Sequence, residues 1–237
     1  MRFYTREWYL KAKAAGIAAR LEICSEEDAV SQKYYEKRFA VMTDEIRTEC
    51  EHSLIDHDPE DAEYLAAQRL SSAIDNLRLV LPEKILSGIP DIRILALNRA
   101  SEKNIRKITE FCDRCREEVA EINFDFETDY PSMTDDIPDE IWQEYGFAGG
   151  KIKKIITGKN TADIIIENFG SGSDVTAVHL RGCTEILIDS DLENSEWIMN
   201  EIYLSNGIYT VCALCKNGNK FPEFTIKAAD ISFDYDR

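Results

Sequence analysis

The fold is decided by residues 196–215, which read EWIMNEIYLSNGIYTVCALC. Two nearly apolar runs flank Asn206-Gly207, a pair that can supply the two positive φ angles of a type I′ hairpin turn. A two-residue loop pairs Leu204 with Tyr209 across the hairpin. In a regular strand, side-chain alternation places Trp197, Met199 and Tyr203 on one face and Ile198, Ile202 and Leu204 on the other. Both faces are apolar, so we expect this hairpin to be covered on both sides.

The same pattern continues on both sides of the hairpin. A second Asn-Gly pair at 217–218 predicts another tight turn, followed by strands at 224–227 and 229–233. Before the hairpin, short apolar runs separated by Gly, Asn and Ser predict strands at 152–157, 162–169, 175–180 and 185–188. These regularly spaced runs predict an antiparallel β-sheet domain over residues 149–237.

Residues 1–122 show helical rather than strand periodicity. Thr5 can cap a helix that runs to about Ile23, and Asp58-Pro59 is a strong start signal for another. Ser101 can cap a longer helix with one apolar seam, which consists of Ile105, Ile108, Cys112, Cys115, Val119 and Ile122. Helices first and strands afterwards predict an α+β chain, with an N-terminal helical domain followed by a C-terminal antiparallel β-sheet domain.

An acidic segment joins the two predicted domains. The formal net charge is −17, and residues 123–145 contain eight Asp or Glu but no Lys or Arg. Because periodicity stops there and prolines occur at 131 and 138, we interpret residues 123–148 as an acidic linker. The charge excludes nucleic acid and anionic membranes as partners, because both require a cluster of basic residues. A basic protein partner fits the charge.

Candidate partner-binding residues come from the acidic segment and from the hairpin. They are Asp129, Asp135, Asp136, Trp197 and Tyr203. Acidic side chains attract a basic surface, and exposed aromatic side chains dominate many protein interfaces. The aromatic residues have an alternative role as core residues, which is the commoner fate of such side chains.

Metal binding is weakly indicated at one place. Cys50, His52, His57 and Asp58 lie close together at a predicted helix end, with Asp56 beside them, but their spacing matches no established ligand motif. The alternative is a polar loop between two helices.

Two Cys-x-x-Cys pairs, at 112/115 and 212/215, suggest a four-thiolate zinc site. However, the first pair lies on the apolar seam of a helix and the second alternates across a strand, so we interpret both as structural. The seven cysteines are expected to be reduced and buried. The alternating acids 125, 127 and 129 resemble a calcium loop, but Tyr130 occupies the position where such a loop needs glycine.

Catalytic motifs are absent from the sequence. There is no nucleophile elbow, zinc-protease motif, Walker motif or dinucleotide fingerprint, and we expect no cofactor. His179 lies in a predicted strand without an adjacent group that would make it a base. The segment 170–173 reads Gly-Ser-Gly-Ser but joins two strands, so we interpret it as a hairpin loop rather than a phosphate cradle.

The chain resembles an uncharacterised family of bacterial proteins of unknown function. The resemblance rests on the opening residues 3–9, Phe-Tyr-Thr-Arg-Glu-Trp-Tyr, on Ile89-Pro90-Asp91-Ile92-Arg93 with Leu97, and on the C-terminal blocks. Those blocks are Trp197, Glu201-Ile202-Tyr203, Phe224-Thr225-Ile226-Lys227 and Asp230-Ile231. Polar groups that the family often carries near residues 146–149 and 209–211 are missing here. The resemblance implies a cytoplasmic bacterial protein and supports the two-part layout, but it carries over no catalytic residue.

Two classes of function follow from the sequence. The first is a non-enzymatic cytoplasmic protein-binding module, with an immunity-like protein that neutralises a basic toxin as one version. The alternative is a metal-dependent hydrolase, or a sensor of a metal or small molecule with a pocket between the helical and sheet parts. The opening residues lack the apolar core of a signal peptide, and no apolar run is long enough to span a membrane. Both observations favour the cytoplasm.

Overall fold

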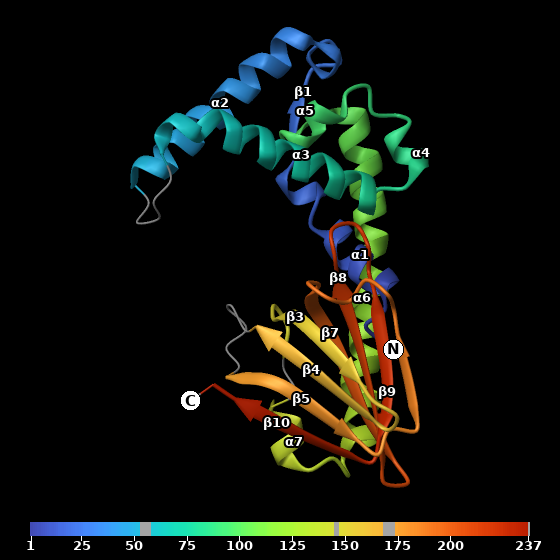
Figure 1. Cartoon of the computed structure of the whole chain (residues 1–237). Coiled ribbons are helices and arrows are strands. Elements are labelled where there is room, and N and C mark those ends of the chain that lie inside the picture. Colours follow the sequence, from blue (N-terminus) through green and yellow to red (C-terminus); the bar gives the residue numbers. More distant parts are fainter. Residues whose placement is uncertain (53–57, 145–146, 168–173, 237) are drawn as a thin grey trace. The chain divides into compact units, whose positions relative to one another are not determined.

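The computed structural model of the chain describes residues 1–52, 58–144, 147–167 and 174–236. It divides into two compact units. Unit 1 comprises Met1–Tyr9 and Ala120–Arg237, and unit 2 comprises Leu10–Val119. Helices precede a large antiparallel sheet, which confirms the expected α+β class (Figure 1). The division differs from the expected domains at 1–122 and 149–237, because the first nine residues and the acidic segment both belong to the unit that holds the sheet.

Helices account for most of the chain before residue 145. They are α1 (Arg6–Ala15), α2 (Gln32–His52), α3 (Ala62–Val80), α4 (Glu83–Leu86), α5 (Ile92–Ala96), α6 (Glu102–Thr134) and α7 (Asp139–Glu144), with short 3-10 helices η1 (Ala18–Arg20), η2 (Asp28–Val30) and η3 (Pro59–Asp61). Asp58 caps η3 by accepting a hydrogen bond from the Glu60 amide, 2.9 Å away, and Pro59 takes the first position. The start signal at Asp58-Pro59 is therefore confirmed.

Unit 2 also contains two short parallel strands that the sequence did not predict. Strand β1 (Glu22–Cys24) pairs with β2 (Arg99–Ser101), although a helix was expected to continue to Ile23. The first helix instead ends at Ala15, before Gly16. Its helical pattern could not reveal the strand, because the partner strand lies far away in the sequence.

Unit 2 buries its apolar side chains in three small clusters. One surrounds Leu77, Leu95 and Ile108, a second contains Cys24, Ala29 and Ile94, and a third is formed by Ile46, Ala62 and Ala66. The first cluster joins α3, α4, α5 and α6, the second joins β1, η2, α2 and α5, and the third joins α2 and α3.

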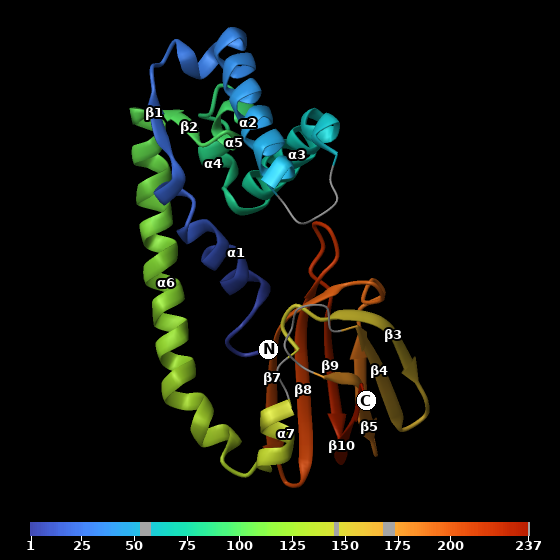
Figure 2. The same cartoon turned by 90° about the vertical axis from the view of Figure 1, so that its left-hand side faces the viewer.

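The sheet of unit 1 has eight antiparallel strands in the order β10-β5-β4-β3-β7-β8-β9-β6. Figure 2 shows β7, β8 and β9 side by side. Their bounds are β3 (Lys151–Thr157), β4 (Thr161–Glu167), β5 (Val175–Arg181), β6 (Glu185–Ile188), β7 (Glu196–Ser205), β8 (Ile208–Lys216), β9 (Glu223–Ala228) and β10 (Asp230–Tyr235). All the expected strands are present; the expected strand end at Phe169 and the segment 170–173 lie outside the described residues. Strands β3 and β7 are paired at a single position, Lys151 with Glu196. The sheet therefore consists of two four-stranded halves, β10-β5-β4-β3 and β7-β8-β9-β6.

The hairpin at residues 196–215 forms in the expected register. Leu204 pairs with Tyr209, and both Asn206 and Gly207 have positive φ, 53° and 73°. The second turn differs from the expectation. Asn217 bonds to Lys220 through both backbone groups, so Gly218 (φ 60°) is the first central residue, as in a type II′ turn.

A β-bulge corrects the expected faces of β7. The register shifts between Trp197 and Met199, so Trp197 lies in the same core as Ile202. The strand alternation had placed these two residues on opposite faces. One extra residue in a strand exchanges the faces beyond it, and sequence alternation alone does not reveal the insertion.

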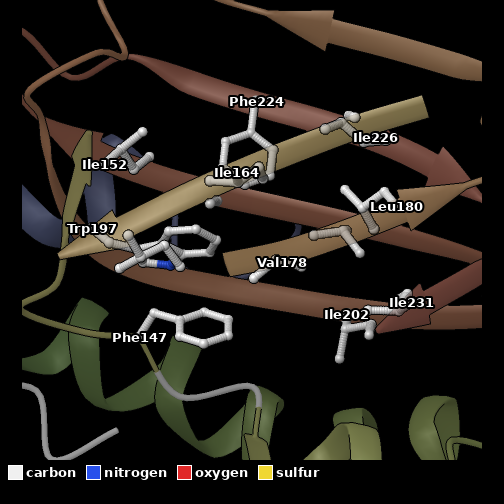
Figure 3. Close-up of a cluster of buried hydrophobic side chains, with 14 of the residues drawn as sticks. Phe147, Ile152, Ile164, Val178, Leu180, Trp197, Ile202, Phe224, Ile226 and Ile231 are labelled. Carbon is white, nitrogen blue, oxygen red and sulfur yellow. The ribbon is translucent and has the colours of Figure 1, made fainter. Parts of the chain in front are cut away.

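The core of unit 1 is one continuous cluster enclosed by both halves of the sheet. Trp197 and Phe224 come from β7 and β9, and Ile164 and Val178 come from β4 and β5. Figure 3 shows these side chains converging, with Phe147 against Trp197. Burial of large apolar side chains at about 1.5–3 kcal/mol each makes this cluster the main source of stability in unit 1.

The acidic segment is helical where a linker was expected. Helix α6 is 33 residues long and continues past Asn123 to Thr134, with Pro131 inside it. In the sequence, Pro131 and the acidic residues obscured an apolar helix face formed by Ile122, Phe126 and Tyr130, which are spaced four residues apart. Proline is tolerated here because it lies in the last turn, where only Glu127 loses an amide partner for its carbonyl.

Candidate functional site

A buried carboxylate organises the polar centre of unit 1. Glu201 on β7 is 0% exposed, and its Oε1 accepts hydrogen bonds from the amides of Phe3 (2.8 Å) and Tyr4 (2.7 Å). Its Oε2 accepts bonds from the Arg2 amide (2.6 Å) and the Tyr203 hydroxyl (2.5 Å). Four donors therefore satisfy the buried carboxylate, and no basic side chain among the described residues forms an ion pair with it. We name this arrangement, Glu201 with the segment Met1–Tyr9, the N-terminal anchor.

Aromatic rings surround the N-terminal anchor. Phe3 meets Phe126 edge-on at 5.5 Å, and Tyr4 lies between Trp8 and Phe126 at 4.6 and 4.5 Å between ring centroids. The Tyr130 hydroxyl accepts a bond from the Ile202 amide (2.8 Å) and donates to the Ile202 carbonyl (3.1 Å). Helix α6 is thereby fastened to the middle of β7.

The tyrosine hydroxyls of this cluster stay protonated. Burial raises the pKa of Tyr130 to about 12. Burial, and then the bond to the Glu201 carboxylate, raise the pKa of Tyr203 above its ordinary value. Both hydroxyls therefore act as hydrogen-bond donors at neutral pH and not as bases.

The candidate partner-binding residues occupy different environments. Trp197 is 0% exposed and packs against Phe147 and Phe224, which places it in the core. Tyr203 is partly buried with its hydroxyl on Glu201. Asp129 forms an ion pair with Arg2 at 3.0 Å, whereas Asp135 and Asp136 are exposed beyond the end of α6.

His179 is part of an ionic cluster that the sequence analysis missed. Its Nδ1 lies 2.7 Å from Asp163 on β4, and its Nε2 lies 3.0 Å from Asp234 on β10. Arg181 also pairs with Asp163, at 2.6 Å. The strand register explains the assembly, because His179 on the central strand β5 lies opposite Asp163 on β4 and Ser232 on β10.

Hydrogen bonds to carboxylates decide the protonation of this cluster. The bond to Asp163, assisted by Asp234, raises the pKa of His179 despite partial burial. The bond from His179, followed by that from Arg181, lowers the pKa of Asp163. The expectation of a histidine without a partner is wrong. Both ring nitrogens lie against carboxylates, so neither is free for general base catalysis.

The residues suggested for metal binding each have a different structural contact. His52 bonds through Nδ1 to the Thr48 carbonyl at 2.8 Å, Cys50 packs against the cluster of Ile46, and Asp58 caps η3. His57 and Asp56 lie outside the described residues. Within the described ranges, no three His, Cys, Asp or Glu side chains are grouped so that they could hold a metal ion.

The Cys-x-x-Cys pairs belong to different units. Cys112 and Cys115 are buried on α6 in unit 2, and burial raises the pKa of both thiols. On β8 in unit 1, Cys215 lies in the main core, where burial raises its pKa to about 12, and Cys212 lies on the opposite face. These thiols are therefore apolar core groups. The acids at 125–129 lie on a continuous helix, which is not a calcium loop.

The chain matches no protein-family model, no curated protein and no solved structure. The resemblance to an uncharacterised bacterial family thus stays a prediction. Through the described ranges, no helix combines the length and apolar character that crossing a membrane requires.

One sequence signal could have identified the N-terminal anchor. Glu201 is a lone acid among apolar residues of a strand expected to be covered on both sides, and such a buried charge needs several donors. The opening aromatic residues were available as partners, but the distance of almost 200 positions gave no reason to connect them. For the His179 cluster, no local signal exists, because its members come together only through strand pairing.

Proposed function

We propose that the protein is a non-enzymatic protein-binding module that recognises a basic partner through exposed carboxylates before α7 and in its first turn. These are Asp135, Asp136, Asp139 and Glu140, which we name the acidic corner. The cytoplasmic location expected from the sequence belongs to this proposal, and an immunity-like protein directed at a basic toxin is one version of it.

The state of the polar groups supports a non-enzymatic role. The strongest candidates for acid–base chemistry, Glu201 and His179, have their oxygens or nitrogens occupied by partners from the fold itself. The buried thiols have raised pKa values, which opposes formation of a nucleophilic thiolate.

The single observation that carries the partner proposal is a set of exposed acids without ion pairs. All four residues of the acidic corner are exposed, and within the described parts of the chain none of them pairs with a basic side chain. By contrast, Asp129 in the same segment is neutralised by Arg2. Unpaired charges of one sign within six residues attract an oppositely charged surface and accelerate association.

A charge-neutral variant tests the acidic corner. The tagged wild-type chain is first used to isolate a stoichiometric partner from host cells. Association rates are then compared for the wild type and for the variant D135N/D136N/D139N/E140Q. We expect the rate to fall by about tenfold at low salt, with a smaller difference at high salt.

A matched control neutralises four exposed acids of unit 2, Glu26, Glu27, Asp75 and Glu83. The proposal requires the control to bind close to the wild-type rate, although it carries the same net charge as the first variant. Equal association by both variants would contradict recognition through the acidic corner.

The metal alternative has a direct test. Native mass spectrometry of the full chain would reveal one bound metal ion per molecule. Retention of such an ion, with its loss after His52→Ala and His57→Ala substitution, would replace the protein-binding proposal with the metal-dependent one. The small-molecule alternative, a sensor with a pocket between the helical and sheet parts, stays a prediction.

A further inference from the structure

Unit 2 contains a pocket lined by four arginines. Its volume is about 310 Å³, at the lower end of the range for small-molecule sites. The arginines come from four different places: Arg20 from η1, Arg38 from α2, Arg69 from α3 and Arg99 from β2. Sequence analysis could not group them, because they are spread over 80 positions. We name this the arginine pocket.

Three glutamates also line the arginine pocket, but they do not neutralise it. Glu22 pairs with Arg99, and Glu49 pairs with Arg69 at 2.7 Å. Glu45 is the third. Arg20 and Arg38 form no ion pair with any residue that the structure describes. The pocket therefore carries a net positive charge in a chain whose overall charge is −17.

Two of the arginines lack acceptors for buried donors. The Nε–H groups of Arg38 and Arg99 are shielded from solvent and have no hydrogen-bond partner. An unsatisfied buried donor is costly, and a native protein normally supplies an acceptor for it. Both donors belong to side chains that line the same pocket. An anion bound in this pocket supplies acceptor oxygens next to both side chains.

Asn98 and four apolar residues complete the lining. Ile46 is 1% exposed and Leu97 is 9% exposed, and Met42 and Ala96 complete this part of the wall. The volume leaves room beside the arginines for an organic group as well as an anion. Charged groups that converge on a pocket of this size, with apolar side chains beside them, fit a small charged metabolite.

We propose that the arginine pocket binds the phosphate group of a small organic phosphate, or free phosphate, between Arg38 and Arg99. A phosphate is tetrahedral and offers several strong acceptor oxygens, so donors that converge from different elements can all be used. A planar carboxylate offers two oxygens and is best matched by a single guanidinium fork. The two ion pairs with Glu22 and Glu49 hold Arg99 and Arg69 in place around the anion.

Calorimetric titration of the full chain tests the proposal, with inorganic phosphate and phenyl phosphate as probes at constant ionic strength. We expect saturable binding at one site, and tighter binding of phenyl phosphate if the natural ligand is an organic phosphate. Arg38→Gln should weaken binding by about tenfold or more, as the loss of a charge-assisted hydrogen bond predicts. Arg78→Gln, an exposed arginine of the same unit outside the pocket, is the matched control.

A second variant separates the pocket from general charge effects. Met42→Trp fills the space but keeps all four arginines, and it should abolish phenyl phosphate binding while the circular dichroism spectrum stays unchanged. Absence of saturable binding of either probe to the wild type would overturn the proposal, as would equal binding by the Arg38 and Arg78 variants. None of these outcomes changes the acidic corner, so the two proposals are tested independently.

Discussion

The two units differ in whether their buried polar side chains have hydrogen-bond partners. In unit 1, each oxygen of the buried Glu201 carboxylate accepts two hydrogen bonds. Three of the four donors are backbone amides and the fourth is the Tyr203 hydroxyl. In unit 2, the Nε groups of Arg38 and Arg99 and the hydroxyl of Ser101 are buried without partners. Across the described residues, every such unsatisfied side-chain group lies in unit 2.

The apolar cores follow the same contrast. Unit 1 has one continuous core enclosed by its sheet, whereas unit 2 divides its apolar residues among three small clusters. A continuous core with satisfied polar groups suits a stable scaffold, and a divided core with unsatisfied donors suits a unit that gains stability from a ligand. Tryptophan fluorescence can follow unit 1 alone, because Trp8, Trp142 and Trp197 all belong to it.

The largest effect is expected at the N-terminal anchor. Glu201→Ala leaves three backbone amides and the Tyr203 hydroxyl without their acceptor, so unit 1 should lose about 3–5 kcal/mol of unfolding free energy. Urea denaturation followed by tryptophan fluorescence measures the loss. Glu196→Ala, at an exposed position of the same strand, is the control and should change stability little. Similar losses of unfolding free energy in both variants would contradict a special role of Glu201.

A cavity in unit 2 tests whether its small clusters matter separately. Ile46→Ala removes a fully buried side chain from the cluster with Ala62 and Ala66, and should cost about 2–4 kcal/mol. Circular dichroism at the helix band should show the loss while the fluorescence transition of unit 1 stays in place. A matching shift of the fluorescence transition would show that the units unfold together and would weaken the contrast.

The bond between α6 and β7 should have a smaller effect. Tyr130→Phe removes the hydroxyl that bonds to both backbone groups of Ile202, and leaves those buried groups unpaired. We expect a loss of about 1–3 kcal/mol in unit 1, measured by urea denaturation. Tyr64→Phe, at an exposed tyrosine of unit 2, should leave the same transition unchanged.

The smallest expected effect on stability comes from the ion pairs of His179, and it depends on pH. The folded pKa of His179 lies above its ordinary value of 6.5, so its ion pairs stabilise the fold fully below pH 6.5 and are lost as pH rises through the folded value. His179→Gln should therefore cost about 1 kcal/mol at pH 5.5 and less at pH 9. Fluorescence-detected denaturation at both pH values checks this. A cost that grows with pH would mean that the neutral imidazole is the form that stabilises the sheet.

The sequence predicted the parts of the fold that depend on local pattern. The hairpin register around Asn206-Gly207 was predicted correctly because a two-residue turn determines which residues pair. The prediction of a linker at residues 123–148 was wrong for residues 123–134, which are helical. Pro131 and the surrounding acids masked the apolar residues Ile122, Phe126 and Tyr130, which recur every four positions on one helix face.

The candidate sites were less predictable, since they depend on residues distant in the sequence. Asp135 and Asp136 were chosen as candidates from charge alone; they are exposed, and their role in binding a partner stays a prediction. The grouping of His179 with Asp234 requires knowledge of strand order, and the partners of Glu201 lie at the other end of the chain. The bulge that moves Trp197 to the other face of β7 leaves no trace in the alternation of side chains.

The N-terminal anchor has a consequence for which substitutions residues 2–4 tolerate. The three bonds from this segment to Glu201 come from backbone amides, which every residue except proline carries. Side-chain substitutions at residues 2–4 therefore keep these donors, whereas proline at any of the three positions removes one of them.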